Sequence, residues 1–398
     1  MRPGPLADPP TGRDTPRVLF VNGGILGLIS FDHFVRDYLP RQQRISGDRI
    51  VLTEGLSVGE RARRHVMCQR LWKDGWLGIA NLDRLRYRAE LHAGVLARAR
   101  IAARAPASYD VLHFHRQATA YASLDLMRRV PAIVSIDATQ QCVIERAATR
   151  VERASYRPNV NRDGAVFRRA AAIVATSRWA AESVRRMYPD CGAAIHVLPN
   201  PVLLEHFDPA WVEARAARAR QGLRPRLLFL GGDFPRKGGY DVLAAWEGSD
   251  LAGRATLELV TNWAIARRLP AGVVVTTGIA PHTPEWSAAW ARADAFVMPT
   301  RNEAFGLVYQ EAAAAGLPAI GTAHHAVPEI VLEGETGVLI RPGDRSALST
   351  AMRVLVDDAE LRERMGRRAR LTIEREAAPG PYMDRLADIV LDLLGRRT

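Results

Sequence analysis

Short apolar runs alternate with helix-like segments along most of the chain, and this alternation limits the possible fold more than any other feature. The runs are apolar at successive positions, so both faces can be buried, as in a parallel sheet that helices cover on both sides. They form two sets, at 17–22, 111–115, 132–136, 172–177 and 195–199, and at 226–231, 256–261, 273–277, 295–299, 319–322 and 337–340. We therefore predict an α/β protein with two doubly wound, Rossmann-like parallel-sheet domains.

The segments between these runs predict the helices and the domain limits. Helical patterns occupy 84–104, 119–129, 140–155, 178–188, 238–247, 285–292, 306–315, 344–357 and 358–376. Residues 199–209 hold three prolines and no helical period, so the first domain is expected at 17–200 and the second at 201–378. The amphipathic stretch 381–394 predicts that residues 379–398 form a helix that packs back on the first domain.

Composition excludes several classes of protein. No window approaches 18 consecutive apolar residues, which excludes a membrane-spanning helix. The first 16 residues carry five prolines and no apolar stretch, so residues 1–16 are expected to be a disordered tail and not a secretory signal. Three cysteines without a CxxC spacing fit a reducing compartment. These features predict a cytoplasmic protein, with a peripheral place at the inner membrane face as an open alternative.

The excess positive charge lies in the first half of the chain. Residues 1–200 hold 31 basic and 18 acidic residues, whereas residues 201–398 hold 24 and 25. A basic half attracts phosphate, anionic lipid or an acidic polymer, and a solvated arginine-rich surface is the alternative. Nucleic acid is not expected as a partner, because the sequence contains no recognised module and no interleaved aromatic residues.

Residues 61–104 concentrate this charge, with eleven basic residues against three acidic ones. Trp72 and Trp76 lie in the same stretch, and basic residues beside clustered Trp and Leu resemble a segment that sits on an anionic membrane. The alternative is a helix that packs both tryptophans inward and turns its arginines to water. Peripheral contact with an anionic membrane through residues 61–104 is therefore one of two open readings.

Lysine is rare in this chain, since only Lys73 and Lys237 occur among the 55 basic residues. Lys237 follows a predicted strand in LGGDFPRKGGYDVL (230–243), where Arg236 and Lys237 open a helix after Gly232. Ligands of open α/β sheets bind outside the carboxyl ends of the strands, where glycine permits close approach and helix N-termini favour anions. We therefore expect Lys237 to bind a phosphate, with a solvated Gly-rich turn as the alternative.

Two glutamates follow another predicted strand in the second half. Glu303 is expected in a loop, and Glu311 in the first turns of the helix that follows. A carboxylate can accept hydrogen bonds from two sugar hydroxyls, and the backbone N–H groups of Phe305, Gly306 and Leu307 could hold a phosphate. The alternative for Glu311 is plain exposure on an Ala-rich helix.

The first half offers weaker candidates. Gly23 and Gly24 follow the first strand and permit close approach of a ligand, although GxGxxG is absent. His113 and His115 alternate on one face of a strand end, so a role on the acceptor side competes with burial in the core. His324 and His325 lack a third ligand at a zinc spacing, and we expect no metal site.

In combination, several of these motifs resemble one family. FLGGDFPRKGG (229–239), NEAFGLVYQEAAAAGLPAIGT (302–322) and VPEIVLEGETGVLIRPGD (327–344) resemble the nucleotide-sugar domain of GT-B-type, family-4 glycosyltransferases. The spacing from Glu303 to Glu311 reproduces the family's E-x7-E pairing. Weaker likeness extends through the first half, as in DVLHFH (110–115). The resemblance implies two Rossmann-like domains that face each other across a cleft.

The resemblance also implies roles for the site residues. Glu311 would bind the donor's ribose, Glu303 hydroxyls of the transferred sugar, and Lys237 the diphosphate. The candidate catalytic residues are therefore Lys237, Glu303 and Arg236, and Gly232 is expected among the donor-binding residues. The backbone at Phe305 and Gly306 would meet sugar or phosphate, and Gly23 with Gly24 would face the donor from the first domain. The family is retaining and usually needs no metal, in agreement with the absence of a DxD motif here. No cofactor is therefore expected beyond the nucleotide-diphosphate sugar, and a sugar, lipid-linked or other anionic acceptor is expected at the first domain.

The chain departs from the family pattern at three places. Gly232 stands where the family often has an arginine, and Arg236 is expected to replace it. Asp137 stands where many members have a histidine and is a possible acceptor-side residue. His325 with Ala326 replaces a glycine pair. A sugar-nucleotide 2-epimerase of the same fold and a non-catalytic nucleotide-sugar binder remain the alternatives to a glycosyltransferase.

Overall fold

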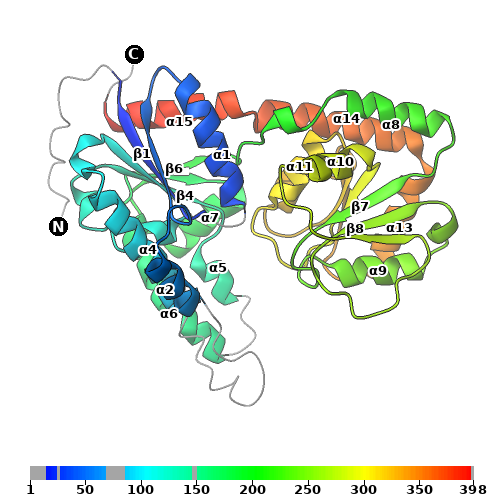
Figure 1. Cartoon of the computed structure of the whole chain (residues 1–398), viewed down its shortest axis with the longest axis horizontal. Coiled ribbons are helices and arrows are strands. Elements are labelled where there is room, and N and C mark those ends of the chain that lie inside the picture. Colours follow the sequence, from blue (N-terminus) through cyan, green and yellow to red (C-terminus); the bar gives the residue numbers. More distant parts are fainter. Residues whose placement is uncertain (1–14, 25–26, 69–85, 146–149, 396–398) are drawn as a thin grey trace. The chain divides into compact units, whose positions relative to one another are not determined.

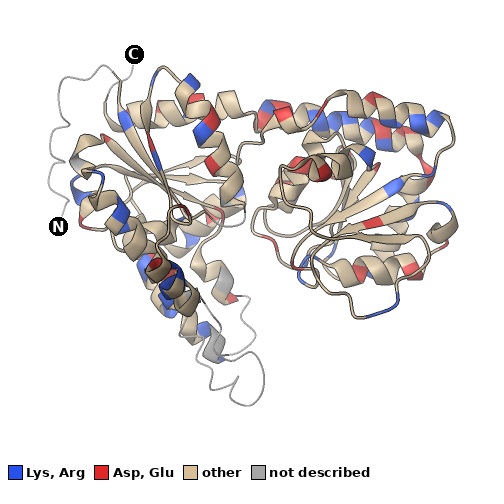
Figure 2. Cartoon of the chain, viewed as in Figure 1, with Lys and Arg blue, Asp and Glu red and all other residues tan. Residues whose placement is uncertain are grey.

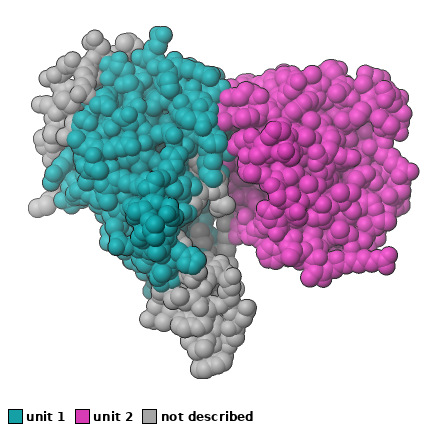
Figure 3. Space-filling view, viewed as in Figure 1, with its two compact units in different colours: residues 1–201, 379–398 teal, residues 202–378 magenta. Residues whose placement is uncertain are grey.

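The computed structural model describes residues 15–24, 27–68, 86–145 and 150–395. The chain divides into two compact units, one of residues 1–201 with 379–398 and one of residues 202–378 (Figure 3). The division falls one residue after the boundary expected from the prolines near residue 200. Most of the expected N-terminal tail lies outside the described residues.

Unit 1 contains a six-stranded parallel sheet in the order β2-β1-β3-β4-β5-β6 (Figure 1). Its strands are β1 (Arg17–Asn22), β2 (Ser46–Val51), β3 (Val111–His115), β4 (Ala132–Ile136), β5 (Ala172–Ala175) and β6 (Ala194–Val197). Its α-helices are α1 (Leu28–Tyr38), α2 (Val58–Cys68), α4 (Arg86–Ala102), α5 (Gln140–Glu145), α6 (Arg150–Phe167), α7 (Arg178–Met187) and α15 (Pro379–Leu393). Every residue of β3 and β4 is buried, as expected for central strands covered on both faces.

The last helix, α15, packs on α1 within unit 1. The ring of Tyr382 lies edge-on to Phe34, with 5.2 Å between the centroids, and meets Phe31 at 6.1 Å. Arg44 adds an ion pair to Asp388 at 2.6 Å. None of the described helices is long and apolar enough to cross a membrane.

Unit 2 contains a second six-stranded parallel sheet, in the order β12-β11-β10-β7-β8-β9. Its strands are β7 (Arg226–Leu230), β8 (Thr256–Val260), β9 (Val273–Thr276), β10 (Ala295–Val297), β11 (Ala319–Thr322) and β12 (Gly337–Ile340). Its α-helices are α8 (Ala210–Arg220), α9 (Gly239–Glu247), α10 (Pro284–Arg292), α11 (Leu307–Ala314), α12 (Val327–Ile330), α13 (Arg345–Asp357) and α14 (Ala359–Glu376). Figure 1 shows α9 and α13 on one face of this sheet and α10, α11 and α14 on the other.

Both sheets confirm the predicted fold class, and several local expectations are corrected. The segment expected as a helix at 119–129 instead forms two 3₁₀ turns, Gln117–Ala120 and Leu126–Arg128. The Thr119 hydroxyl donates to the Arg116 carbonyl at 2.8 Å, and such local bonds compete with an α-helix. The helix expected at 140–155 is divided between α5 and α6.

Candidate active site

The strand order of unit 2 creates a switch point between β7 and β10. The chain passes outward through β8 and β9 on one side of β7, and through β11 and β12 on the other side of β10. In open α/β sheets, ligands bind outside the carboxyl ends of the strands at such a point. The segments that follow β7 and β10 carry Lys237 and Glu303, two of the residues singled out from the sequence.

The segment after β7 packs tightly on the segment after β10. Gly238 has φ +81°, and a Cβ on this residue would lie 2.2 Å from the carbonyl oxygen of Pro299. A Cβ on Gly239 would lie 2.3 Å from the Phe234 ring. Only glycine fits at these two positions, at Gly238 because the loop after β10 lies so close and at Gly239 because the Phe234 ring of its own loop packs on it. Gly232, in contrast, is exposed, with open space around it.

The three residues predicted to be catalytic lie together. The Lys237 ammonium forms an ion pair with the Glu303 carboxylate, and each side chain is 15% exposed. Arg236 approaches the same carboxylate at 3.6 Å. Its guanidinium also donates to the Asn302 carbonyl at 2.6 Å and to Asp233 at 2.9 Å. The site therefore fixes two cations beside one carboxylate at the ends of neighbouring strands.

Glu311 enters the site from α11. This helix begins after Gly306, whose φ of +94° and contact with the Tyr309 ring exclude a side chain. Phe305 is buried and Leu307 is partly exposed, so the Phe305 side chain anchors the backbone of this turn in the core. Burial raises the pKa of Glu311 to about 7, and the Lys237 charge opposes this rise only in part. An ionised Glu311 is costly unless donors reach it, which suits a carboxylate that accepts hydrogen bonds from a ligand.

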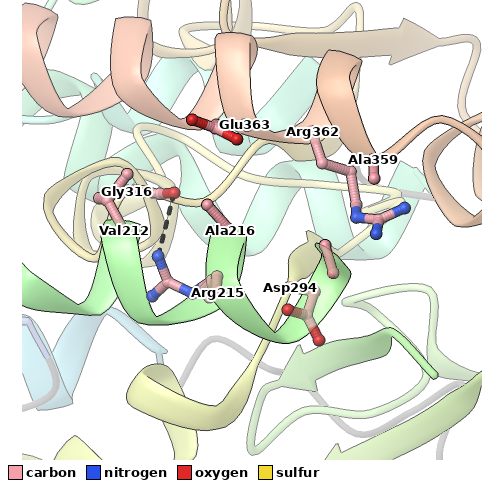
Figure 4. Close-up of a pocket in the computed structure, with 9 residues that line it drawn as sticks. Val212, Arg215, Ala216, Asp294, Gly316, Ala359, Arg362 and Glu363 are labelled. Carbon is pink, nitrogen blue, oxygen red and sulfur yellow. Dashed lines mark hydrogen bonds between the residues drawn. The ribbon is translucent and has the colours of Figure 1, made fainter. Parts of the chain in front are cut away.

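The far end of α11 is fixed by a buried arginine. Arg215, 8% exposed, donates from its guanidinium to the Ala315 carbonyl at 2.7 Å. It also donates to the Gly316 carbonyl at 3.3 Å, the bond drawn in Figure 4. These carbonyls end the helix that carries Glu311, and burial lowers the pKa of Arg215 to about 10. Beside Arg215, between α8 and α14, lies a cavity of about 30 Å³. It has room for about one water molecule and cannot be a nucleotide site.

One residue at this site escaped the sequence analysis. Asp241, in the first turn of α9, is 2% exposed and binds Arg301 and Arg345. The available signal was an acidic residue in the first turn of a mostly apolar helix that begins just after Lys237. Its two partners lie 60 and 104 residues away, and such pairs are not visible from spacing.

In unit 1, the predicted glycines follow β1. Gly24 has φ +66°, its N–H donates to the Asn22 side chain at 2.9 Å, and a Cβ would overlap the Thr53 hydroxyl. Gly23 is partly exposed beside it, so the backbone here is open to close approach. The contact of Gly23 and Gly24 with a donor stays a prediction.

The acceptor-side candidates lie at the ends of β3 and β4. Asp137 is exposed directly after β4. His113 has no exposed surface, lies 2.6 Å from the Ser135 hydroxyl, and has a pKa lowered to about 3 by burial. His115 is 5% exposed and stacks on Phe31 at 3.6 Å. These contacts favour the core alternative for both histidines, because a buried ring cannot meet an acceptor.

A residue next to these histidines was also missed. Arg116 has φ +88° although it is not glycine, and it forms an ion pair with Glu90 of α4. Such backbone strain is most frequent at functional sites. Its side chain is 31% exposed, so Arg116 adds a cation at the carboxyl end of β3.

Within 15–24, 27–68, 86–145 and 150–395, no group of three or more His, Cys, Asp or Glu side chains could hold a metal ion. His324 and His325 contact each other after β11, with 3.3 Å between ring centroids. His325 has φ +53°, at the position where the family pattern has glycine.

Two doubly wound units with charged residues at a switch point define the GT-B class of fold. A family model described as Glycosyl transferases group 1 matches residues 215–372, and one described as Glycosyltransferase Family 4 matches residues 65–206. The chain therefore belongs to the family-4-like, group 1 glycosyltransferases.

Relatives agree with this assignment. Glycogen synthase of Mycobacterium tuberculosis is 30% identical over 275 residues, which cover 66% of this chain and 63% of that protein. Sucrose-phosphate synthase from Thermosynechococcus elongatus has a TM-score of 0.72 at 18% identity, over 96% of this chain and 100% of that chain. Anabaena HepE in complex with UDP-glucose has a TM-score of 0.63 at 16% identity, over 94% and 99%. The chain covers less than two thirds of the length of the first curated relatives.

Proposed function

We propose that this protein is a retaining glycosyltransferase that moves a sugar from a nucleotide-diphosphate sugar to an acceptor hydroxyl, without a metal. The observation that carries the proposal is the meeting of Lys237, Arg236, Glu303 and Glu311 at the switch point of unit 2. Glycan, polysaccharide or glycolipid biosynthesis is the proposed setting, and the cytoplasm, with a peripheral place at the inner membrane face, the proposed location.

The proposed roles follow from the chemistry of each group. Glu311 accepts hydrogen bonds from the ribose diol, which supplies the donors that its ionised form needs. Glu303, which forms an ion pair with Lys237, accepts hydrogen bonds from hydroxyls of the transferred sugar. As the sugar leaves, negative charge develops on the diphosphate. Lys237, Arg236 and backbone N–H groups near Gly306 are fixed donors for this charge and need no reorganisation during the reaction.

The donor class has support from a structural neighbour. HepE, which shares the fold, was crystallised with UDP-glucose.

The acceptor is proposed to bind unit 1, where the positive charge gathers. Figure 2 shows basic residues along α2 and α4. Val58 and Val66 of α2 are 74% and 55% exposed, and Arg63 is exposed between them. Apolar and basic groups on one exposed helix suit a lipid-linked or other anionic acceptor. Trp72 and Trp76 lie outside the described residues.

One experiment separates this proposal from its alternatives. Purified protein is incubated with UDP-, GDP- and ADP-sugars, with and without candidate acceptors, and with EDTA. The products are followed by mass spectrometry, and their stereochemistry by proton NMR. We expect release of one nucleoside diphosphate that depends on acceptor and resists EDTA, with the α or β configuration of the donor retained. Epimerised donor without acceptor would indicate the 2-epimerase, and binding without turnover the non-catalytic binder.

A further inference from the structure

Asp241 holds together the loops that follow β7 and β10, which carry Lys237 and Glu303. It takes no part in the proposed chemistry. Its carboxylate is 2% exposed, whereas its partners Arg301 and Arg345 are 53% and 56% exposed. A desolvated carboxylate is costly unless its oxygens are fully hydrogen bonded. Three charge-assisted bonds meet this need, two at 2.8 and 2.9 Å from Arg301 and one at 2.8 Å from Arg345.

The bond to Arg301 has the geometry of a clamp. The Arg301 guanidinium uses Nε and Nη2 on the two carboxylate oxygens, which fixes its orientation as well as its distance. Arg301 lies two residues before Glu303, in the loop that follows β10. The carboxylate therefore holds this loop onto α9, the helix that begins just after Lys237.

Further hydrogen bonds join the residues around Arg301 to Arg236, the neighbour of Lys237. The Arg301 N–H donates to the Arg236 carbonyl at 2.9 Å, next to Lys237. The Thr300 hydroxyl donates to the same carbonyl at 3.3 Å, and the Arg236 guanidinium returns a bond to the Asn302 carbonyl at 2.6 Å. The loops are thus joined on both sides of Arg301.

The clamp also keeps the Arg301 guanidinium from pairing with Glu303. A third cation so close to Glu303 could pair with the carboxylate that Lys237 and Arg236 already share. With both oxygens of Asp241 bound to Arg301, its guanidinium is directed to α9 instead.

We propose that Asp241 is a positioning residue that, by clamping Arg301, sets the geometry between Lys237 and Glu303 for sugar transfer. The inference rests on the proposed function, because it assigns Asp241 to the same reaction. Asp241 does not itself touch the donor. Arg345 satisfies the remaining acceptor capacity and ties α13 to α9, which is a structural task.

A double-mutant cycle on kcat tests the clamp. Asp241→Asn, Arg301→Gln and the double variant are compared with wild type for turnover of the preferred nucleotide sugar. We expect each single change to lower kcat about 10–100-fold, since small misplacements of reacting groups cost up to about 100-fold. The double variant should be no worse than either single one, because both remove the same interaction. Binding of the bare nucleoside diphosphate should fall by a smaller factor than kcat, since Glu311 is untouched and only the position of Lys237 changes.

Two controls separate positioning from structure. Asp250 also pairs with two arginines, Arg254 at 2.7 Å and Arg353 at 3.3 Å, but is 61% exposed. Asp250→Asn should leave kcat unchanged. Arg345→Gln should lower the melting temperature, and it should lower kcat much less than Arg301→Gln does.

The outcomes are distinct. Near-wild-type kcat in Arg301→Gln overturns the proposal even if Asp241→Asn fails to fold, because Arg301 is a surface side chain. Losses of kcat that add up in the double variant, or a loss in Arg345→Gln as large as that in Arg301→Gln, also overturn it. A wild-type protein that turns over no sugar nucleotide would refute the proposed function itself, a result separate from any difference between variants.

Discussion

Replacement of Glu311 by glutamine should stabilise the protein while it destroys nucleotide binding. Burial raises the pKa of this carboxyl from 4.5 to about 7, so at alkaline pH the folded protein holds a carboxylate in an unfavourable place. At 1.36 kcal/mol per pKa unit the penalty is about 3 kcal/mol, and partial exposure reduces it to about 1–3 kcal/mol. Glutamine is nearly the same size and carries no charge, so the penalty disappears.

The gain depends on pH in a defined direction. The folded-state pKa lies above the unfolded value, so the ionised form is penalised in full above about pH 7. As pH falls from 7 towards 4.5, the folded protein takes up the proton first and the penalty is lost. The stabilising effect of Glu311→Gln should therefore be largest at pH 8 and small at pH 5.

Thermal and urea unfolding at pH 8 and pH 5 measure this difference. Glu376→Gln is the matched control, since that carboxylate belongs to the same unit and its side chain is 50% exposed. The control should change stability by less than about 0.5 kcal/mol at both pH values. A Glu311→Gln protein that is less stable than wild type at pH 8, or equally shifted at both pH values, would refute the reasoning.

Three further perturbations test other parts of the account. Lys237→Ala should lower kcat about 10²–10³-fold in steady-state assays, and Lys237→Arg should restore only part of it, whereas near-normal turnover would exclude the phosphate role. Gly306→Ala should cost about 1–3 kcal/mol because its φ is +94°, while Gly232→Ala, with open space around it, serves as the thermal-melt control. The protein should float with phosphatidylglycerol vesicles at low salt but not at high salt, and Arg63→Glu with Arg64→Glu should abolish flotation. Absence of binding at low salt would leave a soluble acceptor.

The sequence predicted the second sheet nearly complete because its strands are apolar and lie between helices of regular period. Strand β2 was missed, since SGDRIV is polar where it lies at the sheet edge and only its last two residues are buried. The helix expected at 119–129 failed for a different reason. Its side chains bond to nearby backbone, and buried residues such as Tyr121 pack in a tertiary context that local propensity does not describe.

The site was predictable where it depends on topology. Lys237 and Glu303 each follow a strand, and the carboxyl ends of parallel strands share one edge, so their proximity follows from the fold. Asp241 and Arg116 were not predictable in this way. The first depends on arginines far along the chain, and the second on a strained backbone angle that no residue type signals.

The most direct test of the central claim is calorimetric titration of wild type, Glu311→Gln and Glu303→Gln. Each protein is titrated with the nucleoside diphosphate of the preferred donor and with the complete nucleotide sugar. If Glu311 binds ribose and Glu303 the sugar, Glu311→Gln loses affinity for both ligands. Glu303→Gln then binds the bare nucleotide normally and loses only the extra affinity that the sugar provides. Equal losses for both variants on both ligands, or no binding of either ligand to wild type, would contradict the assignment of this site.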